Sequence, residues 1–405
     1  MQFRDFITEQ KNTHMTHIED KVLYGGVKGT REAINALREL RNMLAGKGGN
    51  AKLSTKWDGA PAIFAGIDPR DGEFFVAKKG IFNKNPKVYK TASEIDADTS
   101  GDLASKLKDA LKYLPELGIT GVIQGDFLFS QKDLKNKSID GVKYTTFHPN
   151  TIIYAVPYEQ AAEIRKAKIG IVWHTSYSGT DFESMKATYG VNTSRFQSKN
   201  VYSADAMLRD VSRATMNAKE TEVVTKYLRT AGFLFNKIAG STLRELEKNP
   251  ELAQLIEQYN NTYVRAGQTI PNSLRHVNGL IKWIEQKFQA EADKRKTEKG
   301  KAAQYKRLDD IMKFFSVKNK KSLVSMFDLQ KNLVFAKLRL INKLNSISRL
   351  DTFVQTDKGY KVTGDEGFVA IDDLGGDAVK LVDRLEFSYN NFSPDVLKGW
   401  DKPKG

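Results

Sequence analysis

Two kinds of apolar pattern alternate along the chain. Alternating or unbroken apolar runs of strand length predict β-structure in six segments, which are residues 51–64, 73–84, 121–129, 151–156, 365–371 and 377–384. Residues 205–345 instead repeat their apolar positions at helical spacing, and they separate the first four segments from the last two. The pattern therefore predicts an α+β fold in which helices interrupt a mostly antiparallel sheet.

One more helix is expected near the N-terminus. Its apolar stripe consists of Ala33, Ile34, Leu37, Leu40 and Leu44. Thr30 is a suitable N-cap because its hydroxyl can accept a backbone hydrogen bond, and Gly46 is a suitable end for the helix. We expect this helix to pack on the sheet domain.

Composition narrows the class of protein. With 405 residues, 40% of them hydrophobic, the chain is long enough for more than one domain with an ordinary core. It has no cysteine, which excludes disulfides, thiolate zinc sites and cysteine catalysis. The first residues lack the pattern of a signal peptide, and no window approaches the roughly 18 apolar residues of a membrane span. We therefore expect no membrane association and a cytoplasmic location.

The positive charge of the chain is unevenly distributed. The formal net charge is +15, and residues 205–345 hold 27 Lys and Arg against 15 Asp and Glu, a net charge of +12. Such a basic segment is typical of proteins that bind polyanions, so we predict a basic all-α domain that binds nucleic acid. The alternative is that these charges only solvate helix faces, above all at residues 294–301.

The strongest chemical signal is the tetrapeptide Lys56-Trp57-Asp58-Gly59. A deprotonated lysine can attack the α-phosphate of a nucleotide, and a glycine three residues later lets the backbone approach the phosphates. The tetrapeptide alone is weak, because a K-x-D-G occurs by chance in roughly one chain in ten of this length. Its meaning therefore depends on the segments that follow.

Those segments carry further motifs in a definite order. They are a basic-Gly turn at residues 78–80, Gly125-Asp126 in a strand, an aromatic strand at residues 151–156, an E-G-x-V strand at residues 366–369 and a lysine-bearing strand at residues 377–384. This order resembles the nucleotidyltransferase motifs of ATP-dependent polynucleotide ligases and RNA capping enzymes, over residues 51–175 and 360–390. The whole chain is also similar to phage proteins of this superfamily.

The resemblance implies a fold and a domain order. The fold would be an antiparallel-sheet nucleotidyltransferase domain, ATP-grasp-like as in ligases, interrupted by the basic helical domain. The expected units are residues 1–204 for the N-terminal helix and the first part of the catalytic domain, 205–345 for the inserted domain, 346–390 for the second part and 391–405 for a tail.

The resemblance also assigns roles to three lysines. Lys56 would form the covalent bond to the nucleotide, and Lys380 would approach the α-phosphate. Lys78 would be the basic residue of the turn before Gly80, with an exposed strand end as the alternative. Lys380 and Lys78 would stabilise the negative charge that develops on the phosphate.

The remaining expected site residues are acidic, aromatic or small. Asp126 and Glu366 fall where the superfamily places carboxylates that contact ribose or Mg²⁺, so ATP and Mg²⁺ are the expected cofactors, with Mn²⁺ as a possible substitute. Tyr154 is expected to stack on the purine, and a core position is the equal alternative. Asp58 and Gly59 are expected at the nucleotide, although Asp58 can instead orient the turn through hydrogen bonds.

The function implied is an ATP-dependent polynucleotide ligase that joins 5′-phosphate and 3′-hydroxyl ends through a lysyl-AMP intermediate. RNA is favoured over DNA as the substrate, because the arginine that many DNA ligases carry shortly after the tetrapeptide is absent from Ala60-Pro61-Ala62. Two alternatives remain. One is a capping-type guanylyltransferase that uses GTP, and the other is a noncatalytic nucleic-acid-binding protein on the same fold. The sequence predicts no particular oligomeric state.

Overall fold

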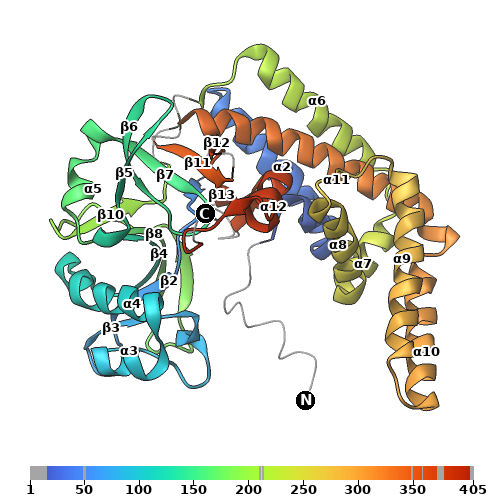
Figure 1. Ribbon diagram of the computed structural model, residues 1–405. Helices are drawn as coiled ribbons and strands as arrows, with labels where there is room; N and C mark the ends of the chain where they lie inside the picture. Colours follow the sequence, from blue (N-terminus) through green and yellow to red (C-terminus); the bar gives the residue numbers. More distant parts are fainter. Residues whose placement is uncertain are drawn as a thin grey trace.

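Two six-stranded sheets occupy one side of the molecule, a body of helices occupies the other, and a three-stranded sheet lies between them (Figure 1). The computed structural model describes residues 16–48, 52–208, 211, 214–347, 350–357, 359–371 and 378–401. Almost all strand pairs are antiparallel, and most of the long helices form a separate body, so the predicted α+β class is confirmed. Among the described residues, no helix has the length and apolar character needed to cross a bilayer.

The first six-stranded sheet runs in the order β10-β8-β4-β2-β3, with β9 paired to β8. Its strands are β2 (Ala62–Ile67), β3 (Phe74–Ala77), β4 (Val122–Ser130), β8 (Ile169–Ser178), β9 (Lys186–Tyr189) and β10 (Val201–Asp205). Helices α3 (Ala92–Asp98) and α4 (Gly101–Tyr113) cover one face, where Leu107 and Ala110 share a core with Ile63 and Ile123. Alternation along β2 and β4 sends these apolar side chains to the helix-covered face.

The second six-stranded sheet runs in the order β12-β11-β7-β6-β5, with β15 paired to β11. Its strands are β5 (Lys135–Ile139), β6 (Val142–Phe147), β7 (Ile153–Pro157), β11 (Asp351–Thr356), β12 (Gly359–Val362) and β15 (Val396–Leu397). The short helix α5 (Ala162–Lys166) follows β7. This sheet joins strands from before and after the helical segment.

The C-terminal segment is part of this sheet, so the predicted tail at 391–405 is wrong for the residues described, which end at 401. Val396 and Leu397 pair with β11. The Nζ of Lys398 donates to Thr151 Oγ1 at 2.8 Å, and the backbone N–H of Gly399 donates to the carbonyl of Asn150 at 2.6 Å. The sequence pattern missed this strand because two paired residues leave almost no periodic signal.

The three-stranded sheet joins the two sides of the molecule. It consists of β1 (Lys52–Lys56), β13 (Gly367–Ile371) and β14 (Ala378–Leu381), in the order β1-β13-β14. One face is apolar and shares the core of the helical body through Leu53, Phe368, Ala370, Val379 and Leu381. The other face carries polar residues, because side chains alternate between the faces of a strand.

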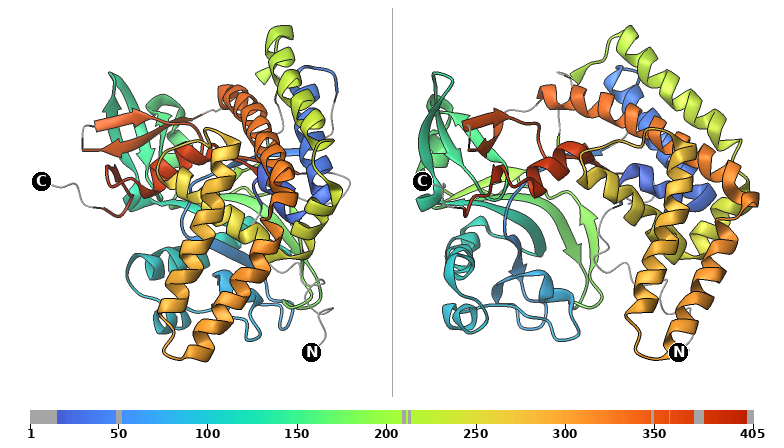
Figure 2. Two further views of the ribbon diagram at one scale, coloured as in Figure 1. Left: turned by 90° about the vertical axis from the view of Figure 1, so that its right-hand side faces the viewer. Right: turned by 45° about the vertical axis from the view of Figure 1, so that its right-hand side comes forward.

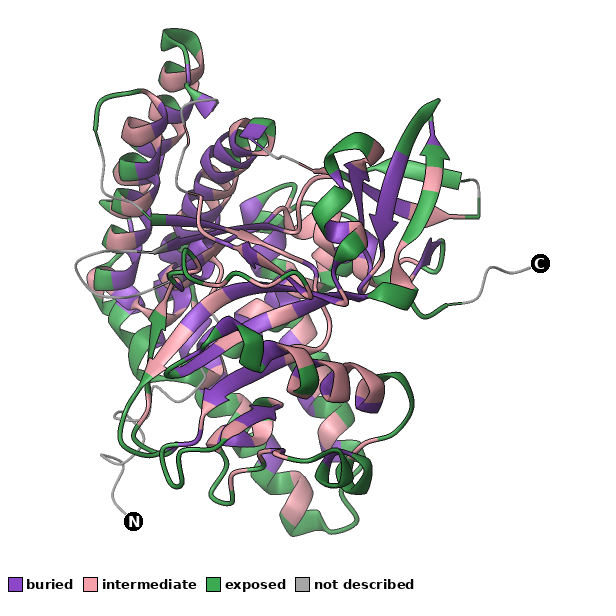
Figure 3. Cartoon of the chain, turned by 90° about the vertical axis from the view of Figure 1, so that its left-hand side faces the viewer, coloured by how far each residue is buried: buried purple, intermediate pink, exposed green. Residues whose placement is uncertain are grey.

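The helical body comprises more of the chain than the predicted inserted domain. Its helices are α1 (Lys21–Tyr24), α2 (Gly26–Leu44), α6 (Ala218–Phe235), α7 (Gly240–Lys248), α8 (Pro250–Arg265), α9 (Ser273–Asp293), α10 (Glu298–Phe314) and α11 (Val317–Leu344). Helix α12 (Arg384–Phe392) packs against α8. Buried positions run along the strands and the inward sides of the helices (Figure 3).

The predicted boundaries at 205 and 345 therefore do not separate two cores. Helix α2 packs against α6, α7 and α11, and its buried Leu37 and Leu40 belong to the core of the helical body. That core continues into the three-stranded sheet. The expectation that the N-terminal helix packs on the sheet domain is corrected, because its apolar stripe completes the helical layer.

The start of α2 also differs from the prediction. The helix begins at Gly26, and Thr30 is buried within its second turn. The hydroxyl of Thr30 donates to the carbonyl of Gly26 at 2.7 Å, so it does not cap the helix. The predicted end is confirmed, because α2 stops at Leu44 and Gly46 has a φ of +68°.

The N-terminal segment ties β14 to the helices. The backbone N–H of Lys380 donates to the carbonyl of Thr16 at 3.1 Å, and His17 forms a parallel bridge with Lys380. Residues 16–17 thus extend the three-stranded sheet at the edge that β14 would otherwise expose.

Glu19 and Asp20, which come shortly after residues 16–17, belong to a buried ion cluster. The Nζ of Lys337 on α11 lies 2.8 and 2.9 Å from the two carboxylate oxygens of Glu19, and both side chains are almost fully buried. The guanidinium of Arg384, at the start of α12, donates to Asp20 at 3.0 Å. Burial raises the pKa of Asp20 to about 7, although Arg384 opposes this shift. The cluster joins the N-terminal segment, α11 and α12 at one point.

Removal of the lysine from this cluster should destabilise the protein strongly. Lys337→Met leaves the buried carboxylate of Glu19 without its main partner, and we expect a loss of about 3 kcal/mol in the free energy of unfolding. Urea denaturation at neutral pH measures this loss. Lys331→Met on the same helix is the control, because the Lys331 side chain is partly exposed and its Nζ lies 3.8 Å from Asp328 Oδ1. This variant should lose less than about 1 kcal/mol in the free energy of unfolding. Equal unfolding midpoints for the two variants would contradict the role of the cluster.

Candidate functional site

Lys56, Glu366 and Lys380 are brought together by the register of the three-stranded sheet. Lys56 ends β1 and lies opposite Gly367, so Glu366 comes next to it, and the Nζ of Lys56 contacts Glu366 Oε2. Ser54 and Lys380 both lie opposite Val369. Directly opposed residues share a face of an antiparallel sheet, so Ser54, Val369 and Lys380 lie on one face. Lys56 lies two residues after Ser54 in β1 and therefore on this same face. The two lysines are more than 300 residues apart in the sequence.

Gly367 makes this arrangement possible. Its φ is +141°, and a Cβ atom at this position would lie 2.6 Å from the carbonyl oxygen of Leu381 and 2.8 Å from Val382 Cγ2. Only glycine fits such a close approach between β13 and the end of β14 without strain. A glycine directly after Glu366 is therefore required by the packing of the sheet itself.

The electrostatics of the site perturb both Glu366 and Lys380. Burial raises the pKa of Glu366 to about 7, against the opposing charge of Lys56, and the nearby carboxylates of Asp58 and Asp126 raise it further. Burial lowers the pKa of Lys380, and the positive charges of Lys56 and Lys79 lower it more. Perturbed acid and base groups that face one another are typical of functional sites.

Asp126 lies directly beneath the K-x-D-G turn. A Cβ atom on Gly59 would lie only 2.6 Å from Asp126 Cβ, and the N–H of Ala60 donates to the carbonyl of Phe127 at 2.9 Å. Gly59 therefore lets the turn approach β4 closely. The close contact between the turn and β4 is therefore sufficient by itself to require glycine at position 59.

Asp58 anchors the turn to the loop before β7. Its buried carboxylate accepts hydrogen bonds from Asn150 Nδ2 at 2.6 Å and from the backbone N–H groups of Thr151 and Ile152 at 2.6 and 2.8 Å. Both carboxylate oxygens are thus engaged by the protein. This geometry favours the orienting role for Asp58 over a direct contact with a nucleotide.

Tyr154 belongs to the same anchor. Its hydroxyl accepts a hydrogen bond from the backbone N–H of Asp58 at 2.6 Å, and its side chain is 1% exposed. One ring contact is with Trp57, whose centroid lies 4.9 Å away, and another is with Phe147, at 5.4 Å. The ring has no open face for a purine, so the predicted stacking role is corrected in favour of the core position. Trp57 packs beneath the turn in the same cluster.

Of the two lysines before Gly80, Lys79 and not Lys78 influences the pKa of Lys380. Lys78 donates to Asp98 on α3 at 3.0 Å and lies over the ring of Tyr89. Lys79 is the residue whose charge lowers the pKa of Lys380. Because Lys78 is engaged by Asp98, Lys79 becomes the candidate for the basic role predicted at Lys78.

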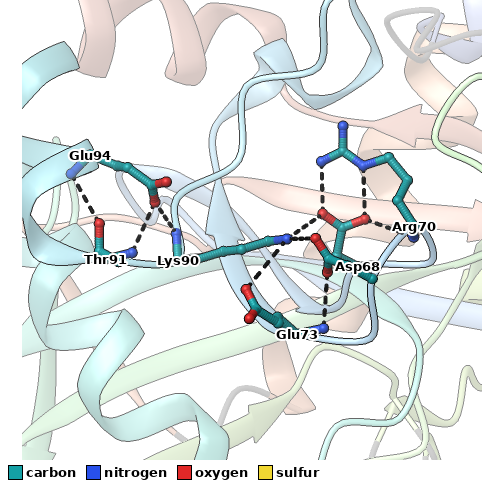
Figure 4. Close-up of polar contacts among 7 residues, drawn as sticks. Asp68, Arg70, Glu73, Lys90, Thr91 and Glu94 are labelled. Atoms are coloured by element: carbon teal, nitrogen blue, oxygen red, sulfur yellow. Dashed lines mark hydrogen bonds and ion pairs between the residues drawn. The ribbon is translucent and has the colours of Figure 1, made fainter.

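The loop that carries Lys79 is braced at its far end by Lys90 (Figure 4). The carboxylate of Asp68 is fully buried and accepts hydrogen bonds from Arg70 at 2.7 and 2.9 Å, while Lys90 Nζ lies 3.1 Å from it. Burial alone would raise the pKa of Asp68, but these partners outweigh it and hold the pKa below its ordinary value. Glu94 accepts a hydrogen bond from the N–H of Lys90 at 2.6 Å.

Two further side chains at the site have no sequence signal. His174 lies in the irregular stretch of β8 opposite β4, with its Nε2 3.7 Å from Asp126 Oδ2 and its Nδ1 2.7 Å from Thr175 Oγ1. Lys106 on α4 reaches the carbonyl of Ala60 at 3.4 Å. Only the pairing of β4 with β8 and the packing of α4 bring these residues to the turn, so no local motif could have identified them.

The donor groups at the site bear on metal binding. No cluster of three or more His, Asp or Glu side chains within the described parts of the chain is arranged to hold a metal ion. A small cavity behind Glu366 is lined by acidic residues, but Asp383 caps α12 and Glu386 accepts hydrogen bonds from Thr363 and Gly364. Glu366 and Asp126 remain as candidate oxygen donors, a set that fits Mg²⁺ because this ion takes most of its ligands from phosphate and water.

The fold and the site define an α+β protein in which a half-buried lysine pairs with a largely buried carboxylate, flanked by further lysines, between its sheets and its helical body. The chain belongs to the family of unknown function DUF6267, which it matches over residues 12–395. Comparisons with curated proteins and with solved structures found no match.

The raised pKa of Glu366 predicts a pH-dependent effect of Glu366→Gln. The folded chain holds the proton of Glu366 up to about pH 7, whereas the ordinary pKa is 4.5. A raised folded-state pKa stabilises the fold below the unfolded pKa, and this contribution is lost as the pH rises through the folded pKa. Glutamine does not ionise, so the variant should gain about 2 kcal/mol of stability relative to wild type between about pH 5 and about pH 8. Urea unfolding of both proteins at both pH values checks this, and a pH-independent difference would contradict it.

Proposed function

We propose that this protein is an ATP-dependent polynucleotide ligase of the lysyl nucleotidyltransferase type, acting on RNA in preference to DNA. The observation that carries the proposal is the contact between Lys56 and Glu366 on the polar face of the three-stranded sheet, with Lys380 on the same face. The order of motifs along the chain supports the same activity. The site would operate in the cytoplasm, or in the host cytoplasm for a phage-encoded protein.

The first step is nucleotidyl transfer to Lys56. The amine must lose its proton before it attacks, and the contact of Lys56 Nζ with Glu366 Oε2 holds the amine in position for the reaction. The Nζ of Lys56 then bonds to the α-phosphorus of ATP, while the bond from that phosphorus to the pyrophosphate oxygen breaks. AMP is transferred next to a 5′-phosphate, and attack by a 3′-hydroxyl joins the ends and releases AMP.

The neighbouring cations have an electrostatic role in this step. Lys380 and Lys79, which influence each other electrostatically, would stabilise the negative charge that develops at the α-phosphate. Asp126 and Glu366 would hold Mg²⁺, or Mn²⁺ in its place, together with phosphate oxygens of ATP, and the bound ion would neutralise charge on the pyrophosphate leaving group. Asp58 and Tyr154 would keep the turn in position.

Lys56 should be the residue that becomes labelled when the protein is incubated with α-labelled ATP and Mg²⁺. Lys56→Ala removes the attacking amine, and Lys56→Arg keeps a positive charge beside Glu366 but cannot lose its proton. We expect both variants to lose the acid-labile, base-stable label completely while circular dichroism stays unchanged.

Parallel incubation with α-labelled GTP distinguishes the ligase from a guanylyltransferase. If GTP labels the wild-type protein and ATP does not, the protein is a capping-type guanylyltransferase and the proposed ligase activity is rejected. Absence of label with either nucleotide would favour a noncatalytic nucleic-acid-binding protein, and labelling of the alanine variant at the wild-type level would show that another residue is the nucleophile.

The paired lysines before Gly80 give a matched test of the site geometry. Lys79→Ala should slow adenylation about 10²-fold, because a cation near the developing phosphate charge is lost. Lys78→Ala removes the same charge one residue away, where it pairs with Asp98, and should change the rate less than about threefold. Single-turnover rates of label formation measure both effects. A larger effect at Lys78 would overturn the assignment of Lys79.

A further inference from the structure

Helices α9 and α10 form an antiparallel hairpin that projects from the helical body (Figures 1 and 2). With 21 and 17 residues they extend about 30 and 25 Å. Their contact is apolar near the body, where Leu280, Ile284 and Phe288 are buried, and Arg307 pairs with Glu251 on α8. The last buried residue of α9 is Ala292, so the connecting turn has no core of its own.

The end of the hairpin concentrates positive charge. Its four basic residues are Lys294, Arg295 and Lys296 in the connecting turn and Lys299 in the first turn of α10, and all four are exposed. None of them has an ion-pair partner among the residues that the structure describes, whereas Lys301 pairs with Glu298 at 3.0 Å. The name basic tip is used below for these four residues.

Helix packing alone does not explain this charge. A cation near the C-terminus of α9 is favourable because of the helix dipole, by about 0.3–1 kcal/mol. Four cations within six residues repel one another, and the hairpin needs none of them for its core. The basic tip therefore has the properties of a contact surface for an anionic partner, at the end of a rigid arm.

We propose that the basic tip binds the sugar-phosphate backbone of a nucleic-acid duplex whose broken end lies at Lys56. This inference rests on the proposed ligase function and adds a second contact to the same substrate. The hairpin and β3 both extend toward the lower edge of the view in Figure 1, from the helical side and the sheet side of the molecule respectively.

The chemistry of the basic tip favours a duplex backbone over other polyanions. Residues 294–301 contain no aromatic side chain on which the bases of a single strand could stack. Their lysines and arginine can contact phosphates without reading the sequence. Residues 294–301 also contain no large apolar side chain to insert into a lipid surface, which membrane-binding segments require in addition to charge.

The test compares two full-length variants with the same change in charge. In the first, the four residues of the basic tip are replaced by glutamine. In the second, glutamine replaces Lys166, Lys186, Arg195 and Lys199, which are also exposed, also three lysines and one arginine, and belong to the sheet side of the molecule. The probe is a fluorescently labelled nicked RNA duplex, titrated at about 50 and about 200 mM salt.

The tip variant should bind the duplex at least about tenfold more weakly than the control variant at the lower salt concentration. Each phosphate contact adds about 0.9 to the slope of log affinity against log salt, so the slope should fall by about 2–4 in the tip variant only. Equal affinities and slopes for the two variants would overturn the proposal. The proposal would also be overturned if the basic tip were needed for binding to anionic vesicles or to a single strand but not for binding to the duplex.

Adenylation of Lys56 by ATP separates this inference from the proposed function. Both variants should be labelled at the wild-type rate, because neither substitution set touches the site. Duplex binding that depends on the tip, without any labelling, would retain the nucleic-acid surface and reject the ligase. Labelling without tip-dependent binding would retain the adenylation chemistry and reject the role of the hairpin.

Discussion

The structure depends on one constraint, the difference between the two faces of the three-stranded sheet. Its apolar face, which includes Leu53, Phe368 and Leu381, is buried in the core of the helical body. Burial of these side chains fixes the register of β1 against β13, because a slip by one residue would move every apolar group to the opposite face. The same register puts Lys56 beside Glu366 and Lys380 on the shared polar face. The packing that stabilises the helical body therefore also assembles the candidate site.

The turn at Lys56 is held by contacts from distant parts of the chain. Asp58 accepts three hydrogen bonds from residues 150–152, and Lys398 donates to Thr151 in that same loop. At the other side of the site, Thr16 is hydrogen-bonded to the backbone of Lys380. Segments near both ends of the chain thus support the two lysines. A reactive group must be held within a narrow range of positions, and buried hydrogen bonds to rigid elements provide that restraint.

Much of the fold and part of the site could be predicted from local pattern. The strands at residues 121–129 and 151–156 and the end of the N-terminal helix at Gly46 lie where apolar alternation and helix-stop chemistry place them. Lys56 and Glu366 were identified from short motifs, and the strands that carry those motifs are neighbours. The choice between Lys78 and Lys79, the core position of Tyr154 and the approach of His174 to Asp126 could not be predicted, since each depends on how strands far apart in sequence align.

The sequence by itself determined that β-rich segments flank a long helical segment, where positive charge accumulates and which short motifs carry lysines and carboxylates. These properties follow from side-chain type and spacing along a few turns of chain. Only the tertiary structure decided that the N-terminal helix completes the helical layer, that residues 396–397 enter a sheet and that Asp58 is an anchor. Long-range strand register and burial decide such questions, because the free energy of packing a side chain depends on neighbours that no local pattern specifies.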